Sequence, residues 1–432
     1  MPRDGSGVYT KPYPSVVSGT TIESLVYNGQ VDDVAQDLNT PRPISAGGTG
    51  ASNAAGAAAN LGVVTGKAVM TYTEAEKTQA RSNIAAAPFD ALAYSGMQVN
   101  GSMEVTQEKG VGVATTLNGA FICDGWRLSK DGTSVVSALV GVGAITPGLP
   151  QLISISVSTA VASLAANDVV AITQNIEGWR LARLAWGTAS AQPITIGFWT
   201  AHHRAGLYTG AVVNKASNRA YGFTYTHSVA DSAQYNTITI PGDTSGIWAI
   251  DNTEALRLSF AMASGSTYYT PVANTWGTSG NFAAVGQING IAATSDVFRI
   301  TGVVVLPGTE APSAARSPLI MRPYDQELLT CQRHWWRGAL CIATHQSYNG
   351  GNTRSSRVTF PVHMRTVPTL TFFDAAAVSG KISWADSAGT QANGFTPPTP
   401  TVSEGGFSFG AGGIGTTSIG SSLFSVNADA RL

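Results

Sequence analysis

Apolar and polar side chains alternate in short stretches between residues 97 and 310, and this pattern constrains the fold more than any other feature. Alternation places apolar side chains on one face of a β-strand and polar side chains on the other. Several short strands with little helical pattern predict a two-sheet β-sandwich of jelly-roll type. The stretches are rich in β-branched and aromatic residues, and clear examples are Leu152–Val157, Ile194–Trp199, Tyr235–Ile240, Leu256–Phe260 and Val297–Val305.

The chain is poor in charge. Asp, Glu, Lys and Arg make up 12% of its 432 residues, against about 25% in an ordinary domain. A formal net charge of −1 gives no field that attracts nucleic acid or an anionic membrane. No run of about 18 apolar residues predicts a transmembrane helix. We therefore expect neither nucleic-acid binding nor membrane insertion, and the composition is typical of an extended β-rich or assembly protein.

Three cysteines, Cys123, Cys331 and Cys341, are too few for a disulfide framework and form no CxxC pair for zinc. We expect buried free thiols, with a redox pair between Cys331 and Cys341 as the alternative. Residues 1–7 contain no apolar run of the kind found in secretory signals. Synthesis in a reducing cytoplasm is the expectation, and nothing in the sequence indicates a cofactor.

Helical spacing appears in the N-terminal region. Thr20 or Thr21 is a suitable N-cap, and Pro41 and Pro43 set the end, because proline forces extended backbone. The helix predicted between these points has apolar residues at Ile22, Leu25, Val26, Val31, Val34, Ala35 and Leu38.

Two Ala-rich units follow, residues 50–62 and 72–85, and each ends in Asn followed by Leu or Ile. Gly62 is the expected C-cap of the first. Isolated helices below about 12–15 residues barely form in water, and alanine faces bury too little surface to hold a monomer together. We therefore expect three neighbouring copies of the chain to stabilise these units. A flexible Ala/Gly linker is the alternative.

The C-terminal region opens with a predicted helix from Tyr324 to Trp336 that Pro323 begins. Leu328, Cys331 and Trp335 share one face of it with Tyr324, and strands are predicted at 357–362 and 369–373. The fold class is therefore mainly β: an elongated multi-domain chain with an N-terminal segment, a helical shaft, a β-sandwich and a small α+β domain. The boundaries predicted for these four parts are 1–42, 43–96, 97–312 and 313–432.

Three places in the chain resemble phage tail-fibre and receptor-binding virion proteins. The N-terminus does so at Met1–Tyr9 and Val17–Ile22, and the shaft repeat of such fibres is similar to Pro43–Ala51 with Ala59–Gly62. The second shaft copy, Gln79–Ile84, ends in Ala85 where glycine is commoner. A C-terminal module of phage virion proteins resembles Glu327–Arg333, Phe360–Arg365 and Pro368–Leu370, with His334 and Trp335 in place of two tyrosines. Cys123–Trp126 and Ile194–Thr200 look like two strands of a jelly-roll, carbohydrate-binding-like module.

The resemblance implies a homotrimeric virion fibre in the tail or collar, made in the cytoplasm of the host bacterium. Residues 1–42 are then expected to attach to other tail, collar or baseplate proteins. The distal part is expected to contact host surface polysaccharide, and the fibre is expected not to be an enzyme. A purely architectural collar or head fibre is one alternative.

Glycan adhesion needs exposed aromatic faces flanked by amides and hydroxyls, and two loops meet this description. The candidate binding residues are Tyr268, Tyr269, Asn274, Trp276, Tyr348 and Asn352. Packing of these rings in the sandwich or at a subunit seam is the competing interpretation for each ring. Trp126 and Trp199 are expected in the core.

A glycan-cleaving tail spike is the second alternative, because a glycosidase needs two converging carboxylates. No spacing selects a pair among Glu177, Asp231, Asp243, Asp251, Glu254 and Asp296. Gly410–Gly415 matches GxGxxG but lacks a suitable helix after it, so a surface loop is expected. Adjacent His202 and His203 would point to opposite faces of a strand, which disfavours a shared metal.

Overall fold

The computed structural model describes residues 18–19, 21, 23–39, 48–51, 53–61, 79–80, 96–279, 282–348, 352–355, 357–386, 390–409 and 420–432. The chain divides into two compact units, residues 1–91 and 92–432. None of the described helices is long and apolar enough to cross a bilayer. The loop at 410–415 lies outside the described residues.

In the first unit, the predicted helix is α1 (Ser24–Asn39), which ends just before the Thr40-Pro41 step. Tyr27, Val31, Val34 and Leu38 follow one another at spacings of four, three and four, and are 43–76% exposed. These side chains form an apolar stripe on one side of the helix. We call it the α1 stripe.

The first Ala-rich unit forms α2 (Ala54–Asn60), capped at its start by Asn53, whose side-chain oxygen accepts the N–H of Gly56 at 2.7 Å. Leu61 is its C-cap residue, and the predicted C-cap Gly62 lies outside the described residues. Of the second unit, 72–85, Gln79 and Ala80 are described and helical.

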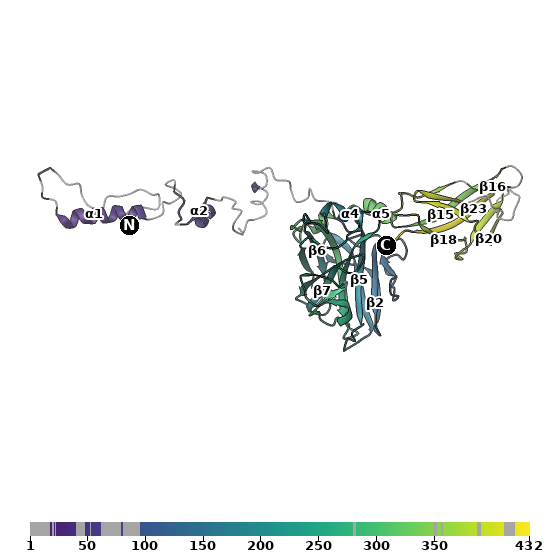
Figure 1. The fold of residues 1–432 in the computed structure, drawn as a ribbon, viewed down its shortest axis with the longest axis horizontal. Coiled ribbons are helices and arrows are strands. Elements are labelled where there is room, and N and C mark those ends of the chain that lie inside the picture. Colours follow the sequence, from purple (N-terminus) through teal and green to yellow (C-terminus); the bar gives the residue numbers. More distant parts are fainter. Residues whose placement is uncertain are drawn as a thin grey trace. The chain divides into compact units, whose positions relative to one another are not determined.

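The middle of the chain is a β-sandwich, drawn from blue to green in Figure 1. One sheet has seven strands in the order β1 (Phe121–Cys123), β2 (Trp126–Asp131), β5 (Val169–Glu177), β10 (Glu254–Ser264), β7 (Gly206–Asn214), β8 (Ala220–His227) and β12 (Trp276–Gly277). The other has five strands in the order β3 (Val135–Thr146), β4 (Leu149–Thr159), β14 (Val297–Pro307), β6 (Ile194–Thr200) and β9 (Gln234–Ile240).

Both sheets are antiparallel, and successive strands often cross from one to the other, as in a jelly roll. Their inner faces form one hydrophobic core that includes Trp126, Phe198, Phe260 and Phe298, all fully buried. The mainly β class and the sandwich predicted from alternation are therefore confirmed. Smaller elements on the sandwich are α4 (Gly178–Leu181), η3 (Ala182–Leu184), η4 (Ser266–Tyr268), β11 (Tyr269–Thr270), β13 (Ala283–Ala284) and η5 (Ser317–Ile320).

Residues 96–98, which lead into the sandwich, are held by arginines. Arg322 donates to the carbonyls of Gly96 and Gln98, the latter at 3.0 Å, and Arg180 donates to those of Met97 and Gln98 at 3.3 and 3.4 Å. Met97 also donates its N–H to Val305 of β14 at 2.9 Å. This short segment is thereby joined to α4, to β14 and to the residues just before α5 (Tyr324–Gln332).

The helix at the start of the C-terminal region is α5 (Tyr324–Gln332), preceded by Pro323 as predicted. It buries Glu327 and Cys331, and Leu328 packs with Val99 and Val105 of the sandwich. The prediction that the helix continues through Trp336 is wrong. Trp335 and Trp336 begin a strand, where large aromatic side chains pack well, and Trp336 packs edge-on against Phe360 at 5.4 Å.

The C-terminal strands, yellow in Figure 1, form two small antiparallel sheets around a phenylalanine-rich core. The first sheet contains β16 (Asn352–Ser355), β15 (Trp335–Tyr348), β23 (Gly420–Asp429), β19 (Ile382–Asp386), β20 (Gln391–Phe395) and β18 (Thr369–Phe373). The second contains β17 (Val358–Thr359), β22 (Gly406–Phe409) and β21 (Pro400–Ser403).

Candidate functional site

A groove of about 410 Å³ lies on the outer face of the five-stranded sheet. It runs between the β3–β4 hairpin and the loop that contains Asp231, and Arg299 of β14 reaches into it. The apolar side chains of Leu139 and Leu152 face it from β3 and β4, and Val142 and Ile145 of the hairpin also line it. Its volume falls within the range of about 300–1,000 Å³ that is usual for ligand sites.

Asp231 is the centre of the polar side. Its carboxylate accepts from Arg299 Nη1 at 2.6 Å and contacts His203 Nδ1 at 2.7 Å. The side chains of Asp231, His203 and Arg299 are 47%, 42% and 30% exposed. Hydrogen bonds from Arg299 and then from His203 lower the pKa of Asp231 below its usual range. A charged but accessible carboxylate therefore faces the groove at neutral pH.

Backbone geometry fixes the position of Asp231. Its φ of 55° is left-handed, a conformation that Asp adopts more readily than most residues. The N–H of Asp231 donates to the carbonyl of His202 at 2.8 Å. The loop is thus tied to the end of β6.

His202 lies under this loop in the core and is fully buried. Its Nδ1 accepts the N–H of Arg299 at 3.2 Å, so the ring proton is on Nε2, which donates to the Tyr225 hydroxyl at 3.1 Å. Burial lowers the pKa of His202 well below its usual range. The neutral ring anchors the backbone of Arg299, while adjacent His203 is outside, as predicted for neighbouring residues on opposite faces.

The other end of this outer face is covered. Trp199 of β6 donates its indole N–H to Ser317 Oγ at 2.8 Å, and its ring lies 5.2 Å from that of Tyr235. Tyr235 lies over Gly197, where a Cβ would clash with its hydroxyl. The expectation that Trp199 is a core residue is therefore wrong: it lies in a strand, but on the outer face under η5. Trp126 is in the core, as expected.

The predicted candidates Tyr268 and Tyr269 lie on the outer face of the seven-stranded sheet. Tyr268 donates its hydroxyl to Asp131 at 2.8 Å and packs edge-on against Phe282 at 5.8 Å. Both tyrosines pack against a small apolar cluster that includes Ala171. The structure brings these two together but places them away from the groove.

Trp276 packs edge-on against Trp186, Trp248 and Tyr221, with ring centroids 5.4–5.7 Å apart. Its indole N–H donates to the carbonyl of Pro241 at 2.9 Å. Nearby Asn274 is exposed, with a left-handed φ of 56°, and its side chain bonds Thr224. The ring of Trp276 therefore contributes to packing at this edge of the sandwich.

Tyr348 and Asn352 face each other across the β15–β16 hairpin. The structure describes their backbone, and their side chains lie outside the described set. Their role in glycan binding stays a prediction.

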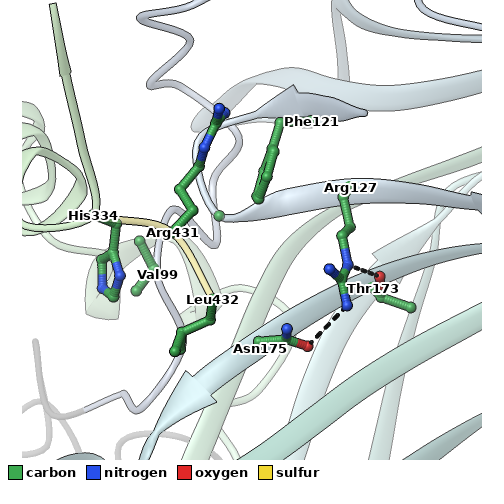
Figure 2. A pocket seen from close by; sticks show the side chains of 9 residues that line it. Val99, Phe121, Arg127, Thr173, Asn175, His334, Arg431 and Leu432 are labelled. Atoms are coloured by element: carbon green, nitrogen blue, oxygen red, sulfur yellow. Dashed lines mark hydrogen bonds between the residues drawn. The ribbon is translucent and has the colours of Figure 1, made fainter. Parts of the chain in front are cut away.

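A second pocket lies between the seven-stranded sheet and the C-terminal residues, and its volume is about 20 Å³. Figure 2 shows Arg127 pointing toward Thr173 and Asn175 on one wall and His334 with Leu432 on another. Arg127 donates to Thr173 at 3.2 Å and to Asn175 at 3.5 Å. This junction pocket holds no more than about one water-sized group.

Each of the six carboxylates considered for glycan cleavage interacts with different partners. Glu177 pairs with Arg333, Asp243 with Arg219 and Asp296 with Arg204. Asp251 accepts from Thr253 and Glu254 from Asn175, while Asp231 is the one in the groove.

Cys123 and Cys331 are buried free thiols, and burial raises the pKa of each well above its usual value. The side chain of Cys341 lies outside the described set. Among the described residues, no group of three or more His, Cys, Asp or Glu is arranged to hold a metal ion.

No protein-family model matches this sequence. No curated protein matches it either. Among solved structures, the enzymatically active domain of tailspike protein 4 of bacteriophage CBA120 is similar at 12% identity and a TM-score of 0.28, over 50% of this chain and 22% of that one.

An arabinose-bound α-L-arabinofuranosidase is similar at 10% identity and a TM-score of 0.30, over 56% of this chain and 30% of that one. The family 11 carbohydrate-binding module of Clostridium thermocellum is similar at 14% identity and a TM-score of 0.24, over 47% of this chain and 100% of that one. This chain therefore spans less than a third of the tailspike domain and of the arabinofuranosidase. Scores of this size assign neither a family nor an activity.

Proposed function

We propose that this chain is a subunit of a trimeric phage tail fibre that attaches the virion to glycan on the host cell surface. The groove on the five-stranded sheet carries the binding part of the proposal. Its exposed Asp231–Arg299 pair lies opposite an apolar wall that includes Leu139 and Leu152. A sugar can form hydrogen bonds with the Asp231–Arg299 pair through its hydroxyls and can pack its C–H groups against the apolar wall.

The fibre part is supported by the resemblances at the N-terminus and around Cys331, and by the α1 stripe. Apolar residues at spacings of four, three and four match the a and d positions of a coiled coil. Copies of this helix packed around an axis would remove the stripe from water. Residues 1–42 would then attach the fibre to other tail, collar or baseplate proteins.

We propose binding rather than cleavage. A glycosidase uses two carboxylates placed on either side of the bond it breaks, and the described residues that line the groove include one, Asp231. A reducing-sugar assay on the bound polysaccharide checks this point. Sustained release of sugar would instead favour a depolymerising tail spike.

The binding test compares Asp231→Asn with Asp251→Asn on a panel of bacterial surface polysaccharides. Asp231→Asn keeps the shape but removes the charge, and a lost charge-assisted hydrogen bond weakens binding about tenfold or more. Asp251 is fully exposed and bonds Thr253 outside the groove, so its variant should bind like the wild type. Equal affinity of the two variants would contradict glycan binding at this groove.

The assembly test is a native mass measurement. The wild type should have three times the chain mass of 44.6 kDa, and Leu38→Asp should reduce it to a monomer by placing charge in the stripe. Leu25 is as exposed as Leu38, 78% against 76%, but lies on the opposite side of the helix. Leu25→Asp should therefore keep the trimer, and a monomeric wild type would contradict the fibre proposal.

A further inference from the structure

The apolar wall of the groove has a gap of defined size. Leu139 and Leu152 flank Gly141, and a Cβ placed on Gly141 would lie 3.6 Å from a δ-carbon of each. The wall therefore leaves space between these two leucine side chains for a small apolar group, of about the size of one methyl.

The polar side is balanced in charge. Asp231 and Arg299 neutralise each other, and His203 contacts Asp231 from its other side. An acidic sugar would have to draw Arg299 away and would leave its own carboxylate facing that of Asp231, which like charges disfavour. A neutral sugar can use Asp231 as an acceptor and Ser154 or Arg299 as donors without breaking the pair.

We infer that the groove selects a neutral pyranose that carries a methyl group, such as a 6-deoxyhexose or an N-acetylhexosamine. The methyl group enters the gap above Gly141, and neighbouring hydroxyls bond the Asp231–Arg299 pair. This inference depends on the proposed function, because it names the ligand class of the same groove.

The experiment measures binding of the full-length protein by calorimetry to sugars in matched pairs. L-Rhamnose is compared with L-mannose, and N-acetylglucosamine with glucose, so that each pair differs in the methyl-bearing group. Glucuronic acid is the acidic probe. One small apolar group in a fitting pocket changes affinity by about tenfold or more, so at least one methyl-bearing sugar should bind about ten times more tightly than its parent.

The pair that shows the preference identifies the source of the methyl group. Equal affinities within both pairs, or tightest binding of glucuronic acid, overturn the inference while sugar binding at the groove stands. Absence of binding by all five sugars and by the polysaccharides counts against the proposed function as well.

Two variants test the placement of the methyl group. Gly141→Ala fills the gap without a clash, so it should weaken binding of the methyl-bearing sugar more than binding of the parent and remove most of the preference within the pair. Leu139→Val, which removes a δ-carbon beside the gap, should reduce the preference about threefold. Leu329→Val is the matched control, since Leu329 is 47% exposed and is not a lining residue of the groove. An unchanged preference in Gly141→Ala would place the methyl group elsewhere.

Discussion

The groove and the contact between β5 and α5 both place arginine beside a carboxylate, but burial of the carboxylate differs. At the contact between β5 and α5, Glu177 is 3% exposed and forms two bonds of 3.0 Å with Arg333. In the groove, Asp231 is 47% exposed. A buried carboxylate must keep its partner, whereas an accessible one can exchange part of its contacts for a ligand. The comparison teaches that the first pair holds the fold and the second is available for binding.

The pKa shifts of Asp124 and Asp231 show the same contrast between burial and exposure. Burial raises the pKa of Asp124 to about 6. In the groove, hydrogen bonds from Arg299 and His203 lower the pKa of Asp231. Desolvation therefore has the larger effect on the pKa of Asp124, whereas hydrogen-bond donors have the larger effect on the pKa of Asp231.

The largest expected effect comes from Glu177→Ala. Removing this buried carboxylate should cost about 3 kcal/mol, because Arg333 loses two hydrogen bonds and the largely buried Arg180 loses a compensating negative charge. Urea unfolding should show this loss in the free energy of unfolding. Sugar binding should be unchanged at temperatures where the variant is folded. Glu310→Ala, at an exposed glutamate, should change stability by less than about 0.5 kcal/mol. A loss below about 1 kcal/mol for Glu177→Ala would remove the distinction between the two regions.

Trp276→Ala should cost about 2 kcal/mol of stability, because three rings pack against this side chain. Groove binding should be unchanged. Trp179→Ala is the matched control, since Trp179 is 61% exposed and should tolerate the change. If Trp276→Ala abolished polysaccharide binding without loss of stability, the tryptophan would be the binding residue that the sequence suggested.

The smallest effect is the pH dependence of binding. Because the pKa of Asp231 in the folded protein is lowered, its carboxylate stays charged down to a pH below the usual aspartate value of about 3.9, and its contribution to sugar binding is lost as the pH falls through the lowered value. Affinity should therefore stay flat with respect to this group from pH 7 to about 4 and decrease below that. The difference in sugar affinity between the wild type and Asp231→Asn, measured by calorimetry at each pH, gives the contribution of the Asp231 carboxylate. A difference that vanishes already near pH 6 would show that Asp231 is not the group responsible.

Much of the sandwich is predictable because strand alternation is a local property. Leu152–Val157, Tyr235–Ile240 and Val297–Val305 lie within β4, β9 and β14. The end of α5 is less predictable, because Trp335 continues the helical period but belongs to a strand that pairs with Asp429. That pairing joins residues far apart in the sequence, so no local pattern reveals it.

The groove is not predictable from the sequence for the same reason. Asp231 and Arg299 are brought together by the adjacency of β9, β6 and β14, and Asp231 is one of several scattered carboxylates along the chain. Exposed aromatic loops are the stronger local signal for glycan binding, but the ring of Trp276 is used in packing. Gly141 and Gly143, inside β3, are a weak local sign of open space at this position.

The arginine contacts to residues 96–98 have a mechanical consequence. A tensile load applied at Gly96 reaches Arg322, Arg180 and the backbone of β14 together, so several hydrogen bonds must shear at once. A segment without these hydrogen bonds would instead let the sandwich rotate about the chain under load. A pull on Gly96 is thus shared by α4, by the residues before α5 and by β14.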